Sequence, residues 1–107
     1  MKLVLAGLAL IALSATVHAE EFNAELTAIN FGTILAAEEP CGMSYEPAAI
    51  EKYVADNVPA EDVGFPATLT RWTRMQKSRV GDMTPSEKVA YCATARQTAA
   101  KLGFVKQ

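Results

Sequence analysis

The sequence predicts an all-α fold, with three or four short helices in a compact array that one disulfide staples together. Apolar residues recur at helical spacing in four segments, and prolines stand close to the segment boundaries. No run of four or more residues alternates apolar and polar side chains as a strand does. The 107 residues allow one small domain and exclude a barrel, a repeat array or a two-domain enzyme.

Residues 1–19 have the order of a secretory signal peptide. Lys2 gives a positive start, residues 3–13 are apolar and uncharged, and Ala19 ends a short polar stretch. We expect cleavage between Ala19 and Glu20. The apolar run is about half the roughly 20 residues that a membrane span needs. Residues 20–107 then form a single small helical domain, with its core at about 31–104.

The first predicted helix covers residues 24–38, where large apolar side chains recur from Leu26 to Leu35. Gly32 interrupts the pattern, and we expect the helix to be frayed before Phe31. An acidic stretch containing a proline follows and ends the helix.

The second predicted helix begins at Pro47, which suits the first helical position, and ends near Asn57. Tyr53 and Val54 lie on its apolar face. Pro59 disfavours helical backbone at the residue before it, so the helix cannot continue.

The third predicted helix begins at Pro66 and runs to about Ser78. Its apolar side chains fall within about 120° of one another, which is typical of a helix that faces a core. These are Phe65, Leu69, Trp72 and Met75. A basic face made by Arg71, Arg74 and Lys77 lies opposite.

The fourth predicted helix covers residues 85–102 and has the clearest local signals. Thr84 and Glu87 are spaced as a capping box, with proline between them at the first helical position. Gly103 is placed for a left-handed C-cap and Phe104 for the accompanying apolar contact. One apolar stripe runs along the helix through Val89, Cys92, Ala95, Ala99 and Leu102.

Cys41 and Cys92 are the only cysteines, and both follow the signal peptide. An even number of thiols in an exported chain predicts a disulfide. Closing a loop of about 52 residues is worth on the order of 4 kcal/mol. A redox pair two residues apart and a four-ligand zinc site are the functional alternatives, and neither pattern is present.

The charges are divided along the chain. Residues 20–62 carry ten carboxylates and one lysine, whereas residues 63–107 carry eight basic and two acidic side chains. We favour a structure in which the halves pack together and their fields largely cancel. The alternative is an interaction face for an anionic partner or a membrane surface. That candidate face consists of Arg71, Trp72, Arg74, Lys77 and Arg79. Membrane contact is not favoured, and the exported, acidic chain lacks a nucleic-acid-binding module.

Few catalytic groups are available. The single histidine, His18, leaves with the signal peptide, so histidine-dependent triads cannot form. The chain also has no phosphate-binding glycine loop and no calcium loop. We expect no enzymatic activity, no cofactor and no bound metal. Two sets of groups remain as residual alternatives for a small hydrolase. They are the carboxylates Glu38, Glu39, Glu61 and Asp62, and the serines Ser44 and Ser78.

Residues 41–104 resemble a group of small two-cysteine exported proteins of host-associated Gram-negative bacteria. The resemblance is carried by the stretches 41–45, 58–62, 83–88 and 91–92. It implies a periplasmic helical domain and implies no activity. The size, helical content and single disulfide are also similar to acid-activated periplasmic chaperones of the HdeA and HdeB type. That similarity is architectural only, and no functional residue beyond the cysteines is carried over.

These observations lead to two functional hypotheses. The first is a non-enzymatic periplasmic protein that acts through protein interaction, in envelope stress resistance or in survival and virulence in a host. In a chaperone variant of this hypothesis, acid exposes apolar surface. Without histidine the trigger would be the protonation of carboxylates, which ordinarily occurs near pH 4. The alternative is a secreted effector or inhibitor that binds a host or envelope target through the basic helix at 66–79. Neither the partner nor the oligomeric state follows from the sequence.

Overall fold

The computed structural model describes residues 21–106 and forms four helices there, with no strand. They are α2 (Ala24–Ala37), α3 (Pro47–Asn57), α4 (Phe65–Gly81) and α5 (Pro85–Lys101). The predicted all-α class is confirmed for this part of the chain. Residues 1–19, predicted as a signal peptide, and the cleavage position at Glu20 lie outside the described residues. None of the four helices is long and apolar enough to cross a membrane.

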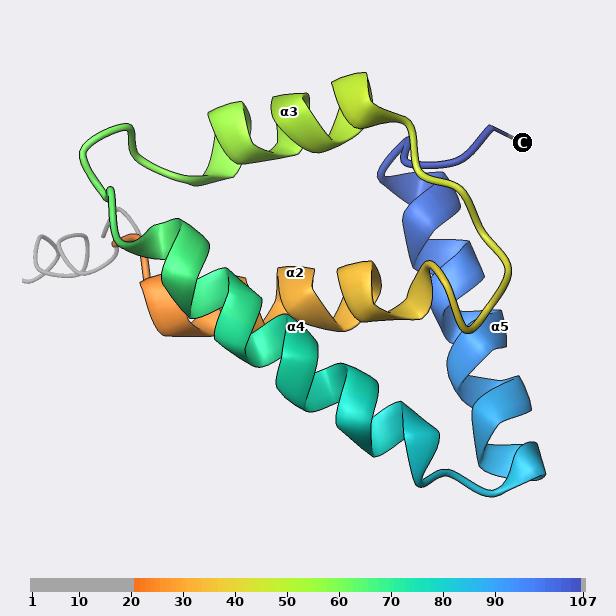
Figure 1. Cartoon of the computed structure of the whole chain (residues 1–107). Coiled ribbons are helices and arrows are strands. Elements are labelled where there is room, and N and C mark those ends of the chain that lie inside the picture. The colour runs from red at the N-terminus through yellow and green to blue at the C-terminus, as the bar shows by residue number, and fades with distance from the viewer. Residues whose placement is uncertain (1–20, 107) are drawn as a thin grey trace, which may run out of the picture.

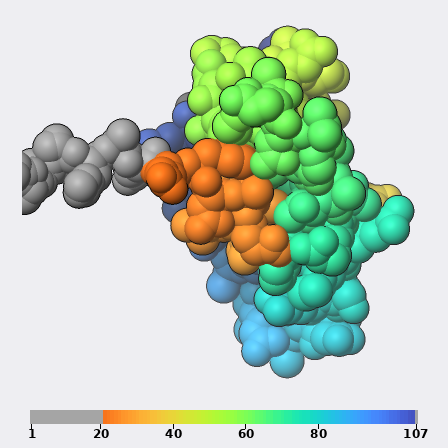
Figure 2. Space-filling model, turned by 90° about the vertical axis from the view of Figure 1, so that its left-hand side faces the viewer, coloured from red at the N-terminus to blue at the C-terminus, as the bar shows by residue number. Residues whose placement is uncertain are grey.

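Helix α2 lies at the centre of the arrangement (Figure 1). Helix α4 crosses it, α3 runs along its other side, and α5 meets its C-terminal end. Figure 2 shows α2 against α4, with α3 above both. The main core cluster takes buried side chains from α2, α4 and α5, including Phe31, Phe65 and Ala99. Helix α2 is therefore the element on which the other three are assembled.

The first turn of α2 is regular, so the expected fraying before Phe31 is wrong. The Asn23 side chain caps the helix by accepting a hydrogen bond from the backbone amide of Leu26 at 2.9 Å. Burial of Ala28, with no exposed surface, fixes the following turn against the core. An effective cap and a buried alanine offset the weak periodicity of this segment.

The chain leaves α2 through one further turn that ends at Gly42. Gly42 has φ +69°, and its amide donates to the Glu39 carbonyl while the Met43 amide donates to the Glu38 carbonyl. This pair of bonds is a Schellman motif, which requires a left-handed residue and thus favours glycine. Cys41 is held one residue before that glycine.

Helix α4 is longer at both ends than the predicted segment 66–78. It begins at Phe65, with proline at the second position, and continues to Gly81. Val80 explains the extra turn, because its side chain is buried with 2% exposure. The predicted core position of Met75 is wrong, since its side chain is 39% exposed. It lies beyond the stretch of α4 that packs on the main core.

The terminal signals of α5 are confirmed. The Thr84 hydroxyl accepts from the Glu87 amide, and the Glu87 carboxylate accepts from the Thr84 amide. At the other end Gly103 has φ +81°, and Phe104 is fully buried. The predicted apolar stripe is only partly buried, because Val89 is 70% and Leu102 41% exposed.

Aromatic side chains from four different segments form the centre of the core. Phe31 and Tyr53 have ring centroids 4.4 Å apart, and Phe104 lies 6.1 Å from Phe31 and 5.5 Å from Tyr45. Such tilted pairs are worth about 0.5–1.5 kcal/mol each beyond the burial of apolar area. The aromatic cluster therefore joins α2, α3, the loop before α3 and the C-terminal tail.

Candidate functional site

The predicted disulfide is present and joins the loop after α2 to α5. The Cα atoms of Cys41 and Cys92 lie 5.4 Å apart. Their side chains form a second buried cluster with only Ala37 and Ala95 as buried partners. This cluster contains no large buried aliphatic or aromatic side chain. The covalent bond thus holds α5 at a place where the buried apolar side chains are small and contribute little hydrophobic stabilisation.

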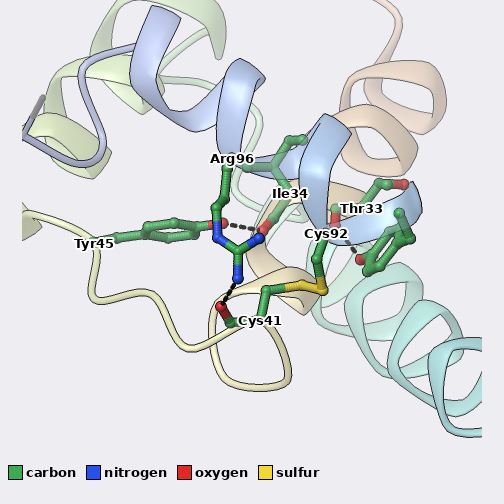
Figure 3. Close-up of a disulfide and its surroundings, with 7 residues drawn as sticks. Thr33, Ile34, Cys41, Tyr45, Cys92 and Arg96 are labelled. Atoms are coloured by element: carbon green, nitrogen blue, oxygen red, sulfur yellow. Dashed lines mark hydrogen bonds between the residues drawn. A yellow bond between two sulfur atoms is a disulfide. The ribbon is translucent and has the colours of Figure 1, made fainter. Parts of the chain in front are cut away.

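Two hydrogen bonds reinforce the junction between α5 and the α2 segment, by which we mean α2 and the turn after it as far as Gly42 (Figure 3). The Arg96 guanidinium donates to the Cys41 carbonyl oxygen at 2.7 Å, and the Tyr91 hydroxyl donates to the Thr33 carbonyl oxygen at 2.9 Å. The Tyr45 hydroxyl donates to the Ile34 carbonyl oxygen at 2.6 Å. That carbonyl belongs to the last turn of α2, where carbonyls lack following helical amides.

The first two residues of the predicted interaction face share one acidic partner on α2. A single oxygen of Glu25, Oε2, accepts from Arg71 Nη2 and from Trp72 Nε1, each at 2.7 Å. The Arg71 guanidinium carbon also lies 5.9 Å from the centre of the Trp72 ring. Trp72 packs against the main core while its indole N–H reaches the rim. These two residues of the predicted face are turned toward α2.

The other three residues of the face are arranged differently. Lys77 Nζ lies 3.5 Å from Glu39 Oε1, which makes a second ion pair between α4 and the α2 segment. Arg74 and Arg79 are exposed. Neither forms an ion pair within residues 21–106. The basic face of α4 is therefore divided between cations that meet α2 and cations that meet solvent.

Three of the four ion pairs in the described part of the chain join the acidic first half to the basic second half. Glu25 meets Arg71, Glu39 meets Lys77, and Glu46 approaches Lys106 at 3.9 Å. The acidic half and the basic half therefore pack against each other, as we favoured from the sequence. The Arg71 and Glu25 side chains are 54% and 53% exposed, so the pair is worth no more than about 1 kcal/mol.

All but one of the residual catalytic candidates have structural partners or lie exposed. The Glu38 carboxylate accepts the Tyr45 amide at 2.8 Å, and Glu39 meets Lys77. Glu61, Ser44 and Ser78 are exposed, and Asp62 is half-buried. Residues 21–106 contain no cluster of three or more side chains suited to hold a metal ion.

Burial raises the pKa of three tyrosines. The pKa of Tyr45 rises to about 12, first because its phenol is desolvated and second because the negative charge of Glu38 disfavours a phenolate. Desolvation also raises the pKa values of Tyr53 and Tyr91. These three phenols stay protonated as hydrogen-bond donors or core groups well into the alkaline range.

A surface hollow of about 470 Å³ lies beside the disulfide, along the first half of α5. Its apolar lining includes Met83, Val89 and Cys92, and its ionisable lining consists of Lys88 and Arg96. No pattern discussed above predicted this hollow. The available signal was the spacing of residues 88, 92 and 96, which puts two cations and one cysteine on the same face of a helix.

Comparison with protein-family models, curated proteins and solved structures gives no match to this chain.

Proposed function

We propose that the chain is an exported, periplasmic helical protein that acts without catalysis, through protein interaction, in envelope stress resistance or in survival and virulence in a host. In this proposal acid is the trigger. Acid loosens the contact between α2 and α4. The core side chains of those helices become exposed as a result and bind unfolded client proteins. The disulfide limits how far the opened chain can expand.

The observation that carries the proposal is the chemistry of the contact between α2 and α4. Two ion pairs join α4 to this part of the chain, and in each the carboxylate precedes α4: Glu25 lies on α2 and Glu39 in the turn after it. The same Glu25 oxygen also holds the indole of Trp72. Protonated carboxyl groups lose their attraction for cations, so each of these contacts weakens in acid. Protein carboxyl groups ordinarily protonate near pH 4.

The exposed ion pairs alone are too weak to drive opening, because each contributes no more than about 1 kcal/mol. The larger effect is the change of net charge. Residues 20–107 hold twelve carboxylates and nine basic side chains, so the net charge changes from −3 to +9 when every carboxyl is protonated. Eight of those cations lie in residues 63–107, mostly on α4 and α5. Their mutual repulsion is then unopposed by the acidic half.

The test follows exposure of the core and protection of a client between pH 7 and pH 2. Trp72 is the only tryptophan, and its emission reports the contact with Glu25. We expect a change in emission, binding of an apolar dye and suppression of aggregation of an unfolded client, all over the same acid range. Unchanged dye binding together with no client protection would overturn the proposal.

A pair of matched variants separates the specific contact from the overall charge. Glu25→Gln with Glu39→Gln removes both carboxylates from the α2 side, and we expect opening to begin at higher pH. Glu51→Gln with Glu61→Gln removes the same charge from two exposed positions that form no ion pair within residues 21–106. An equal shift in both double variants would mean that the contact between the helices has no special role.

A second candidate function is a secreted effector or inhibitor that binds its target through α4. Exposed Arg74 and Arg79 favour it, because no carboxylate of the described chain neutralises them. Fractionation of cells that express the protein distinguishes the two. Retention in the periplasm contradicts an effector that acts beyond the envelope.

A further inference from the structure

We propose that the hollow beside the disulfide is a docking site for an acidic, apolar peptide segment of a protein partner, used at neutral pH in the folded state. The inference rests on the proposed function only in taking the partner to be a protein. It goes beyond that function by giving the place on the fold and the chemistry of the bound segment. Acid-induced opening plays no part in it.

The apolar part of the hollow is formed where α5 extends beyond its packing against α2. Val89 is 70% exposed although it belongs to the apolar stripe of the helix. It lies with Met83, Cys92 and Ala93 in the lining. The volume of about 470 Å³ is enough for one or two large apolar side chains.

The charge of the hollow has one sign. Its ionisable lining residues are Lys88 and Arg96, and no lining residue is acidic. Neither cation belongs to an ion pair within the structure of residues 21–106. Arg96 uses Nη2 to hold the Cys41 carbonyl, and a guanidinium has five N–H donors, so further donors remain for a ligand. The site therefore complements a segment that carries carboxylates.

The spacing of the two cations specifies the segment further. Lys88 and Arg96 are eight residues apart on one helix, which corresponds to roughly 12 Å along its axis. An extended peptide advances about 3.3 Å per residue, so two carboxylates four residues apart span nearly the same distance. The residue midway between them then lies over the apolar lining between the cations. The fitting sequence is an acidic residue, any residue, a large apolar residue, any residue and an acidic residue.

The rigid floor of the site supports its use in recognition. Cys92 and Cys41 both line the hollow and are joined covalently beneath it. The bond between Arg96 and the Cys41 carbonyl fixes the second cation relative to that floor. A preformed site loses less conformational entropy on binding than a mobile one.

The test titrates the oxidised protein at pH 7 with a synthetic peptide that has a leucine midway between two glutamates four residues apart. Backbone amide NMR signals are followed up to millimolar peptide. We expect saturable shifts at Val89, Cys92, Ala93 and Arg96. The same peptide with lysines in place of the glutamates should bind at least tenfold more weakly. Absence of shifts, or equal binding of the two peptides, would overturn the proposal.

Matched variants of α5 place the binding in the hollow. Val89→Asp and Lys88→Glu should each weaken binding at least tenfold, whereas Ala90→Asp and Lys101→Glu introduce the same charges at exposed positions outside the lining and should leave it unchanged. Circular dichroism checks that all four variants fold. Two further outcomes would also contradict the proposal. One is binding to phosphatidylglycerol vesicles but not to the peptide, and the other is self-association that Val89→Asp abolishes.

Discussion

Gly32 shows how one missing side chain determines a helix contact. A Cβ atom built at Gly32 would lie 3.1 Å from both the amide nitrogen and the Oγ1 of Thr73 on α4. The nitrogen belongs to a helix backbone and cannot move without moving α4. Glycine is usually a weak helix former, by about 1 kcal/mol relative to alanine. Its presence inside α2 is explained by the close approach of α4 at this point.

Gly32→Ala should therefore destabilise the protein despite its better helix propensity. We expect the free energy of unfolding to fall by about 1–2 kcal/mol, because overpacking forces the two helices apart. Urea unfolding followed by Trp72 emission measures the change. Gly81→Ala is the control, since nothing lies within 4 Å of its added Cβ, and it should gain up to about 1 kcal/mol. A stabilised Gly32→Ala variant would contradict this account of the contact.

Tyr45 makes stability fall in alkali. An unfolded tyrosine loses its proton near pH 10, whereas folded Tyr45 has its pKa raised to about 12. Between these values the native state binds more protons than the unfolded state, so the free energy of unfolding decreases as pH rises. From Tyr45 alone we expect a loss of about 2 kcal/mol at pH 12. Tyr53 and Tyr91, with pKa values raised in the same direction, add to it.

Urea unfolding at several pH values between 9 and 12 tests this dependence. Tyr45→Phe should flatten the decline, and at pH 7 it should cost about 1 kcal/mol because the bond to the Ile34 carbonyl is lost. Tyr53→Phe is the comparison, because the Tyr53 hydroxyl makes no hydrogen bond in the described structure. An identical decline in the wild type and in Tyr45→Phe would contradict the assignment.

At the scale of the elements, local signals placed the helices well. Pro47 marks the start of α3 because proline has no amide that would be left unpaired there. Thr84 and Glu87 mark the start of α5 because their side chains pair two of its free amides. Both signals depend only on residues that are close together in the sequence. The start of α2 at residue 24 was predicted, but the regular order of its first turns was not, because the cap Asn23 precedes a segment with weak apolar periodicity. The end of α4 was missed because burial of Val80 depends on a neighbouring element.

The candidate site was much less predictable than the helices. The sequence favoured packing of the acidic half against the basic half, but it did not pair Glu25 with Arg71 and Trp72, which are 46 and 47 residues away. The exposure of Val89 could not be predicted either. A helical pattern identifies the apolar face of a helix, but it does not show which part of that face lies beyond the contact with the neighbouring helix. Both facts depend on the crossing of whole helices.

The capping box of α5 gives a prediction at this scale. Thr84→Ala removes the hydroxyl that accepts the Glu87 amide, and it should lower the free energy of unfolding by about 1 kcal/mol. Ser86→Ala is the control, because Ser86 is exposed within the same turn and its side chain has no hydrogen bond in the described structure. It should change stability by less than about 0.5 kcal/mol. Equal effects of the two variants in thermal unfolding would show that the box contributes nothing.

The disulfide acts on the whole molecule, since few large side chains join α5 to α2. Reduction should lower the free energy of unfolding by about 4 kcal/mol, the value for a loop of this length. The unfolded chain then regains the conformational entropy that it lost when the disulfide closed the loop between two cysteines 51 residues apart. Small domains have only about 5–15 kcal/mol in total. Urea unfolding with and without reductant measures the difference. The double variant Cys41→Ser with Cys92→Ser should not respond to reductant, and a loss below about 1 kcal/mol in the wild type would contradict the prediction.

The position of the disulfide also divides the described chain into a covalent ring and two arms, residues 21–40 before the ring and residues 93–106 after it. Residues 41–92 form the ring, which contains α3, α4 and the first half of α5. Helix α2 precedes Cys41 and so belongs to the N-terminal arm, although it supplies the centre of the core. If acid releases α2 as proposed, the ring still limits how far α3, α4 and the first half of α5 separate. We therefore expect refolding to depend mainly on the return of α2 to a ring whose conformational freedom the disulfide already limits.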